Sequence, residues 1–222
     1  MIEAEPAAAA PLFADRIELA REFTRALGEH GEERGLIGPL EPPRLWSRHI
    51  LNSAIAAPLF RPGRVGDVGS GAGLPGLVLA IARPDVDFVL IEPMERRVAW
   101  LNEQVEALRL TNVDVVRGRG EDTHLSAPLN QVTARAVSAL RTLLPVTVPL
   151  LRPGGEFVFL KGANAAAELN AAAKELRHFG VIGAEVVMLG EGVLDDVTRV
   201  IRGTVARRSP SRAVLAVDGR AR

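Results

Sequence analysis

Apolar residues in the first sixty positions recur at three- and four-residue spacing, the pattern of a helix that packs one face against a core. The first such stripe predicts a helix that Gly28 and Gly31 can end. Its members are Leu12, Ile17, Ala20, Phe23 and Leu27. Residues 31–43 contain three glycines and three prolines and indicate a loop, and a second helix is expected over Pro43–Ala57. Residues 1–60 are therefore expected to form an N-terminal helical extension.

From residue 61 onward, short β-rich runs alternate with helical ones. Strands are expected at Arg64–Gly69, Asp87–Glu92, Val113–Arg117, Gln131–Val137, Glu156–Lys161, Ala184–Leu189 and Val197–Arg202. Helices are expected between them at Leu74–Arg83, Met94–Leu110, Leu140–Leu151 and Ala165–Phe179. Such alternation requires an α/β fold, in which a mostly parallel sheet carries helices on both faces. We expect this seven-stranded, Rossmann-like domain over residues 61–206.

Composition and charge exclude several classes of protein. The 222 residues are 47% hydrophobic and 24% charged, which is enough to build a full core. The absence of cysteine excludes disulfides, thiolate metal sites and a cysteine nucleophile. The formal net charge is zero, so any binding of nucleic acid must come from a local patch. The one strongly basic stretch is 199–222, with seven arginines and one acid, and residues 207–222 are expected to be a disordered basic tail.

The most informative segment is Asp67–Gly76, with the sequence DVGSGAGLPG between an expected strand and an expected helix. Its glycines permit a sharp turn and a close approach of a ligand to the backbone, and the following helix is expected to offer free N–H groups to an anion. A dinucleotide site requires G-x-G-x-x-G, but Leu74 stands where the third glycine should fall. The spacing D-x-G-x-G-x-G instead resembles the first motif of class I S-adenosylmethionine (SAM) methyltransferases.

Three further segments follow the ends of expected strands, where ligands bind in such sheets. Glu92 ends the second strand and is suited to accept hydrogen bonds from ribose hydroxyls, which both SAM and NAD possess. In the Gly118–Asp122 loop, a backbone N–H and an acid are suited to hold an adenine edge, although a plain solvated turn is the alternative. Arg135 is flanked by alanines in a buried strand and needs a partner, either a structural ion pair or a ligand at the mouth of the site.

Taken with the N-terminal segment, these motifs resemble the ribosomal small-subunit methyltransferase G family over roughly residues 12–205. The segments that carry the resemblance are Trp46–Ser53, Asp67–Leu77, Glu92–Pro93 with Arg96–Arg97, Thr133–Ala136 and Leu160–Gly162. The Leu-Pro-Gly continuation of the glycine loop is unusual among methyltransferases in general and makes the match specific.

The resemblance implies SAM-dependent methylation of N7 of a guanine in the decoding-region loop of 16S rRNA. Its cofactor residues fall on the glycine loop and the strand ends, with Glu92 as the ribose acid: Gly69, Gly71, Leu74, Glu92, Gly120, Glu121 and Arg135. Two positions depart from the family pattern. Gly120 stands where a small residue such as alanine is usual, and Gly66 interrupts a strand that is more often β-branched, which is expected to weaken that strand slightly.

The expected chemistry agrees with the residues that are missing. Guanine N7 carries a free lone pair, so its methylation needs two aligned reactants and no base. Methylation at pyrimidine C5 needs a cysteine nucleophile, which the chain lacks. Methylation of exocyclic amines typically uses an Asn/Asp-Pro-Pro-Tyr/Phe loop after the fourth strand, and this chain has Arg-Ala-Val-Ser at positions 135–138 and no tyrosine.

The substrate side is less defined, and no catalytic residue is assigned. Arg48, His49 and Asn52 on the second helix, with Lys161 at the end of the fifth strand, are candidates to meet phosphates or the target base. The alternatives are a packing histidine and a solvated row of arginines. With so small a basic patch, we expect the partner to be the small ribosomal subunit or its precursor rather than naked RNA. The enzyme itself is expected to be a cytoplasmic monomer that uses no metal and no membrane. Rival readings are a methyltransferase of small molecules or proteins, a non-catalytic nucleotide-binding module and a NAD oxidoreductase.

Overall fold

Seven strands form one mixed sheet in the order β3-β2-β1-β4-β5-β7-β6. The computed structural model describes residues 1–123 and 125–206, so the expected tail at 207–222 lies outside it. The strands are β1 (Arg64–Val68), β2 (Asp87–Glu92), β3 (Val113–Arg117), β4 (Leu129–Arg135), β5 (Leu151–Lys161), β6 (Val181–Leu189) and β7 (Thr198–Val205). The strands β1 to β5 pair with one another in parallel, and β7 runs antiparallel to both β5 and β6. The mostly parallel α/β fold is confirmed.

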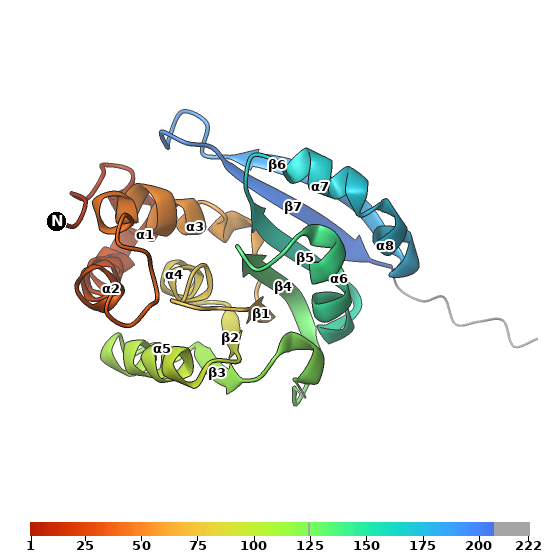
Figure 1. Ribbon diagram of the computed structural model, residues 1–222, viewed down its shortest axis with the longest axis horizontal. Coiled ribbons are helices and arrows are strands. Elements are labelled where there is room, and N and C mark those ends of the chain that lie inside the picture. Colours follow the sequence, from red (N-terminus) through yellow and green to blue (C-terminus); the bar gives the residue numbers. More distant parts are fainter. Residues whose placement is uncertain (124, 207–222) are drawn as a thin grey trace, which may run out of the picture.

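Helices cover both faces of this sheet (Figure 1). On one side lie α1 (Ala9–Phe13), α2 (Ile17–His30), α3 (Asn52–Ala54), α4 (Gly76–Ala82) and α5 (Glu95–Ala107). On the other lie α6 (Leu140–Thr147), α7 (Ala165–Ala171) and α8 (Ala173–His178). The apolar stripe of the N-terminal segment shares one core cluster with α4 and β1, where Phe23 and Leu27 are fully buried. Full burial of one such side chain contributes about 1.5–3 kcal/mol, so the N-terminal segment is firmly attached to the sheet domain.

The prediction of one regular helix over Pro43–Ala57 is wrong. The chain instead forms a 3-10 turn at Pro42–Arg44, a π-helical turn at Trp46–Leu51, the short α3 and a 3-10 turn at Ala57–Leu59. A π turn widens the helix and shifts which side chains share a face, and such turns are frequent at functional sites. The shift places Trp46 and Ile50 in the core and turns His49 toward the strand ends.

Other boundaries moved for local reasons. The strand expected over Gln131–Val137 ends at Arg135, because Ala136 has a φ of +55° and leaves the extended conformation. The helix expected over Leu140–Leu151 ends as α6 and is followed by a 3-10 turn (Val148–Leu150), because Leu151 already pairs with Leu129 of β4. The helix expected over Ala165–Phe179 divides at Ala172 into α7 and α8.

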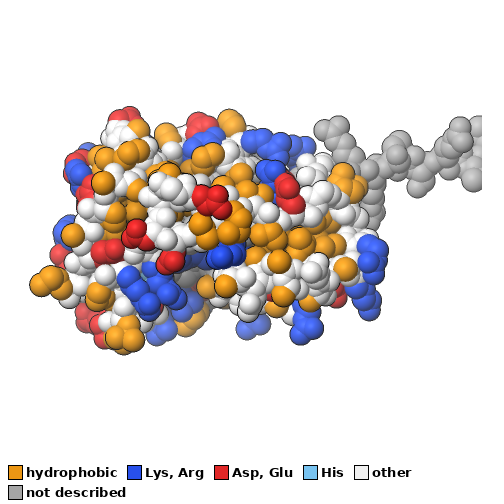
Figure 2. Space-filling view, turned by 90° about the horizontal axis from the view of Figure 1, so that it is seen from above, with side chains coloured by type: hydrophobic (Ala, Val, Ile, Leu, Met, Phe, Trp, Pro, Cys, Tyr) orange, Lys and Arg blue, Asp and Glu red, His pale blue; other side chains and the backbone are white. Residues whose placement is uncertain are grey.

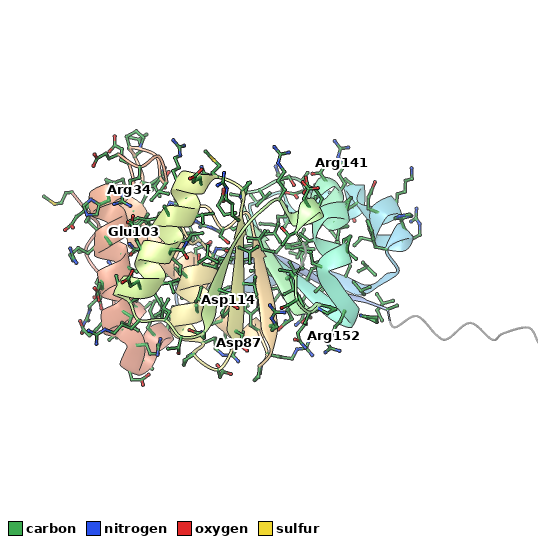
Figure 3. All side chains as sticks on the ribbon, turned by 90° about the horizontal axis from the view of Figure 1, so that it is seen from below. Arg34, Asp87, Glu103, Asp114, Arg141 and Arg152 are labelled. Atoms are coloured by element: carbon green, nitrogen blue, oxygen red, sulfur yellow. The ribbon has the colours of Figure 1, made fainter. Side chains whose placement is uncertain are left out.

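The carboxyl ends of the parallel strands gather at one edge of the sheet. Figure 3 marks the two edges: Asp87 and Asp114, near the starts of β2 and β3, lie on one side, and Arg141, at the start of α6, lies toward the other. Arg34 and Glu103 also point toward one another in this view, and their 2.5 Å ion pair ties the loop after α2 to α5. Within the described residues, no helix has both the length and the apolar character that crossing a membrane requires.

Candidate active site

The glycine loop after β1 has the backbone that its sequence predicts. Gly69, Gly71 and Gly73 have φ angles of +76°, +56° and +94°, a region that side chains disfavour. Trp100 on α5 donates from Nε1 to the carbonyl oxygen of Ala72 at 3.0 Å and fixes the outer side of the loop. A Cβ atom added at Gly69 would lie 2.8 Å from Cγ2 of Val137, so the chain after β4 closes tightly over the loop.

The expectation of free N–H groups at the start of α4 is wrong for its first residue. The Gly76 N–H donates to Oδ2 of Asp67 at 3.0 Å, so the protein's own carboxylate takes the place of an external anion. A Cβ at Gly76 would lie 2.5 Å from that oxygen, which explains the glycine of the Leu-Pro-Gly sequence. Asp67 is fully buried, and burial raises its pKa to about 7. The loop is thus braced from beneath by a residue that the sequence reasoning did not assign.

Glu92 lies directly beside the glycine loop. Its Oε2 accepts from the Gly71 N–H at 2.9 Å, and its Oε1 accepts from the Met94 N–H at 3.0 Å. A carboxylate has about four acceptor positions, so two hydrogen bonds leave capacity for ribose hydroxyls. The arrangement couples the acid at the end of β2 to the central glycine, and its ribose role stays a prediction.

Two cavities flank Gly69. The loop cavity, of 310 Å³, is lined by residues of the glycine loop, by the charged side chains of Glu41, Arg48, Arg97 and Arg135, and by His49. The apolar cavity, of 260 Å³, is lined by Ile91, Val137, Leu143 and Val146 and by the Gly118–Glu121 segment. Leu74 lines the loop cavity, whereas Gly120 and Glu121 line the apolar one. Six of the seven predicted cofactor residues therefore line one or both of these adjoining spaces, one mixed and one mainly apolar, whereas Glu92 lines neither.

This division fits SAM, which has a charged amino-acid end and a flat, largely apolar adenine. The loop cavity is suited to the charged end and the apolar cavity to the adenine, with the ribose beside Glu92. Gly120 matters here for a steric reason: an added Cβ would lie 2.5 Å from Cγ1 of Val146. Glycine, in place of the alanine usual in the family, therefore allows α6 to pack closely against the 3-10 turn Gly120–Asp122.

Arg135 stands at the mouth of the loop cavity without a carboxylate within 4.0 Å among the described residues. Its Nη2 donates to Nδ1 of His49 at 2.8 Å, and its Nη1 donates to the backbone oxygen of Arg48 at 3.3 Å. Burial lowers the pKa of Arg135 to about 10, while the charge of Asp67 acts in the opposite direction. The alternative of a structural ion pair is not what the structure shows, and the role at the ligand mouth stays a prediction.

His49 is fixed as a neutral ring. Because Nδ1 accepts from Arg135, Nε2 must carry the hydrogen and donates to Oε2 of Glu41 at 2.6 Å. Burial and the charge of Arg135 lower the pKa of His49, which also favours the neutral form. Burial raises the pKa of Glu41, but hydrogen bonds from His49 and Arg44 outweigh it and leave the pKa below its usual value. Glu41, His49 and Arg135 form a connected row that the sequence reasoning found only in part.

A third and larger space, the outer cleft, adjoins the loop cavity and measures 910 Å³. Arg48, His49, Arg135 and Ala136 line both. All four predicted substrate-side residues line the outer cleft: Arg48, His49, Asn52 and Lys161. The structure therefore brings them together at the place where a second reactant would meet the cofactor.

Besides His49, two of these four side chains are engaged by the protein itself. Asn52 donates from Nδ2 to Oγ1 of Thr198 at 2.7 Å and so links α3 to β7. The Lys161 side chain is only 8% exposed, and its Nζ lies 2.9 Å from Oε2 of Glu168 and donates to the Ser138 oxygen at 2.6 Å. Both residues build the wall of the cleft, whereas the side chain of Arg48 is 57% exposed, although its Nε lies 3.3 Å from Oε2 of Glu41.

Several known proteins are similar to this chain over most of its length. The family model for rRNA small subunit methyltransferase G matches residues 16–196. The ribosomal RNA small subunit methyltransferase G of Leifsonia xyli subsp. xyli is 74% identical over 204 residues, which cover 92% of this chain and 98% of that relative. The corresponding protein of Clavibacter michiganensis subsp. michiganensis is 64% identical over 206 residues, covering 93% and 98%.

Solved structures agree on the fold. N-methyltransferase NodS from Bradyrhizobium japonicum, solved with S-adenosyl-L-homocysteine, has a TM-score of 0.55 at 16% identity and covers 80% of this chain and 98% of that chain. The tRNA (m1A58) methyltransferase TrmI from Aquifex aeolicus has a TM-score of 0.52 at 16% identity, covering 70% and 67%. At such identities the likeness concerns the fold alone. The family model and the close relatives go further, and the chain belongs to the rRNA small subunit methyltransferase G family, as an enzyme with the class I SAM-dependent methyltransferase fold.

Proposed function

We propose that this enzyme transfers the methyl group of SAM to N7 of a guanine in the decoding-region loop of 16S rRNA. The observation that carries the proposal is the junction of the outer cleft with the loop cavity along Arg48, His49, Arg135 and Ala136. A base in the cleft would meet the cofactor at this junction. The names of the close relatives supply the class of RNA, and the chemistry of the junction supports N7.

When bound, SAM supplies an electrophilic methyl group on a sulfonium. The residues of the chain have to hold and orient, because N7 needs no proton removed before it attacks. The glycine loop and Glu92 bind the cofactor, and Arg135 orders the mouth of its cavity. His49 is unsuited to act as a base, because Arg135 and Glu41 occupy both of its nitrogens. This junction therefore suits a reaction governed by alignment.

We also propose that the substrate is the assembled small subunit or its precursor, met by a monomeric enzyme in the cytoplasm. On the face seen in Figure 2, small groups of basic side chains are separated by acidic, apolar and neutral ones, without one broad basic field. With a formal net charge of zero, binding by general attraction to phosphates would be weak. Recognition then depends on a folded RNA surface that fits the cleft.

The test is transfer of labelled methyl from SAM to 30S particles isolated from cells that lack the enzyme. Methylation at N7 places a positive charge on the imidazole ring, so mild reduction and aniline should cleave the RNA at one new site. Particles from deficient cells should lack this cleavage, and purified enzyme with SAM should restore it. A methyl group found on N1, N2 or a pyrimidine C5 would contradict the proposed reaction while leaving the fold intact.

A further inference from the structure

The β6–β7 loop, residues 190–197, forms a wall of the outer cleft, and the proposed reaction assigns no role to its residues. Two carboxylates line the cleft, Glu168 and Asp196. Glu168 is engaged, because Oε2 lies 2.9 Å from Lys161 Nζ and accepts from the Leu140 N–H at 3.0 Å. Asp196 is exposed, and among the described residues its carboxylate has neither an ion pair nor a side-chain hydrogen bond. It is the carboxylate of the cleft that remains available to a ligand.

Asp196 does not line the loop cavity on the cofactor side of the cleft. The loop cavity shares Arg48, His49, Arg135 and Ala136 with the cleft, and Asp196 is not among its lining residues. Asp196 also lines a separate cavity of 400 Å³ between the β6–β7 loop and the N-terminal segment, together with Asp195 and Arg48. A base that spans the cleft would therefore present one edge to the cofactor junction and the opposite edge to Asp196 in the β6–β7 loop.

A guanine so placed would offer hydrogen-bond donors to Asp196. With N7 directed at the cofactor junction, the opposite edge of the purine carries the N1–H and the N2 amino group. A carboxylate is acceptor-only and takes both donors, whereas adenine presents a bare N1 acceptor there and would be repelled. Discrimination of this kind is strong, because the wrong base leaves a charged acceptor facing an acceptor.

The charges around Asp196 argue in the same direction. Arg48 and Arg199 line the same cleft and suit the RNA backbone, whereas a free carboxylate repels phosphates. Its presence in a cleft for RNA is favourable where hydrogen-bond donors such as base N–H groups meet it. Resting on the proposed function, we propose that Asp196 determines specificity for guanine by accepting hydrogen bonds from N1–H and the N2 amino group of the target base.

The test uses semisynthetic 16S RNA with guanine or inosine at the mapped target, assembled into 30S particles. Inosine keeps N7 and N1–H but lacks the amino group. We expect wild-type kcat/KM to fall about tenfold on inosine, and Asp196→Asn to lose roughly ten- to a hundredfold on guanine, the usual range for a charged hydrogen bond. In Asp196→Asn, the preference for guanine over inosine should shrink toward one. Asp195→Asn, which alters a neighbour outside the cleft, should keep both the rate and the preference.

Each other result overturns the proposal. If Asp196→Asn methylates guanine at the wild-type rate, Asp196 does not contact the base. If the variant is slower but keeps its preference for guanine over inosine, the role of Asp196 is structural. Affinity for SAM, measured by calorimetry, should be unchanged, and a loss would place Asp196 with the cofactor. If the wild-type enzyme methylates N7 and Asp196→Asn keeps the preference for guanine, this inference is wrong and the proposed function stands. If the wild-type enzyme methylates another position of the RNA, the proposed function is wrong as well.

Discussion

The glycine loop and the outer cleft are built in different ways. The loop is local: within Asp67–Gly76 the turns follow from glycines, and its carboxylate braces come from the ends of β1 and β2. The cleft is assembled from distant segments, so that Asn52 is held by Thr198, 146 positions away. Backbone conformation thus preforms the cofactor side, while a network of side chains shapes the substrate side. Substitutions in the loop should therefore impair SAM binding, and substitutions in the cleft should impair methyl transfer to the RNA.

The largest expected effect is on the cofactor side. Gly71→Val should abolish SAM binding in calorimetry, because φ at this position is +56° and the new side chain would enter the loop cavity. Gly183→Val is the matched control, since Gly183 has a φ of +62°, has no atom within 4 Å of an added Cβ, and lies in β6 away from the site. If folded Gly71→Val binds SAM as the wild type does, the loop is misassigned.

Arg135 links the two regions, and its removal should disable the reaction. Arg135→Ala takes away the donor that holds His49 and leaves Arg48 as the one guanidinium among the residues shared by the two spaces. We expect 30S particles treated with this variant and SAM to show no cleavage at the N7 site. Lys174→Ala, an exposed change on α8, should restore the cleavage fully. If both variants restore the cleavage equally, Arg135 has no role at the mouth of the site.

A smaller, graded loss is expected for Glu92→Ala. The substitution removes an acceptor for ribose hydroxyls worth about 1.5–3 kcal/mol and frees the N–H groups of Gly71 and Met94. Affinity for SAM should fall roughly ten- to a hundredfold in calorimetry. The exposed Glu95, which pairs with Arg117, provides the control Glu95→Ala. Wild-type affinity in Glu92→Ala would mean that the ribose is held elsewhere.

The smallest effect concerns stability and pH. Burial raises the pKa of Asp67 from 3.8 to about 7, so between these values the folded state binds more protons than the unfolded state. The contribution of Asp67 to stability is therefore fully present below the lower value and is lost as pH rises toward 7. Asp67→Asn should remove this slope, measured as the change in urea midpoint between pH 5 and pH 7. An identical slope in the variant would assign the pH dependence to other groups.

The success of the sequence-based predictions follows the same division. The turns of the Asp67–Gly76 segment were predicted, because they depend on neighbours in sequence, whereas the hydrogen bond from the Gly76 N–H to Asp67 was not. The second helix was predicted as regular, yet it contains a π turn at Trp46–Leu51, since packing of Trp46 and Ile50 overrides the local pattern. Glu41 and Asp196 were missed, because single acids in loops carry no periodicity that marks them.

By itself, the sequence determined the alternation of strands and helices, the backbone of the glycine loop and, through its lack of cysteine, the kinds of chemistry that are excluded. The tertiary structure alone decided that Lys161 braces a wall, that His49 is held neutral between Arg135 and Glu41, and that Asp196 faces the cleft. The physical reason is the range of the interactions. Backbone dihedrals and hydrophobic period act over a few residues, whereas ion pairs and hydrogen bonds between side chains depend on which distant segments the folded sheet brings together.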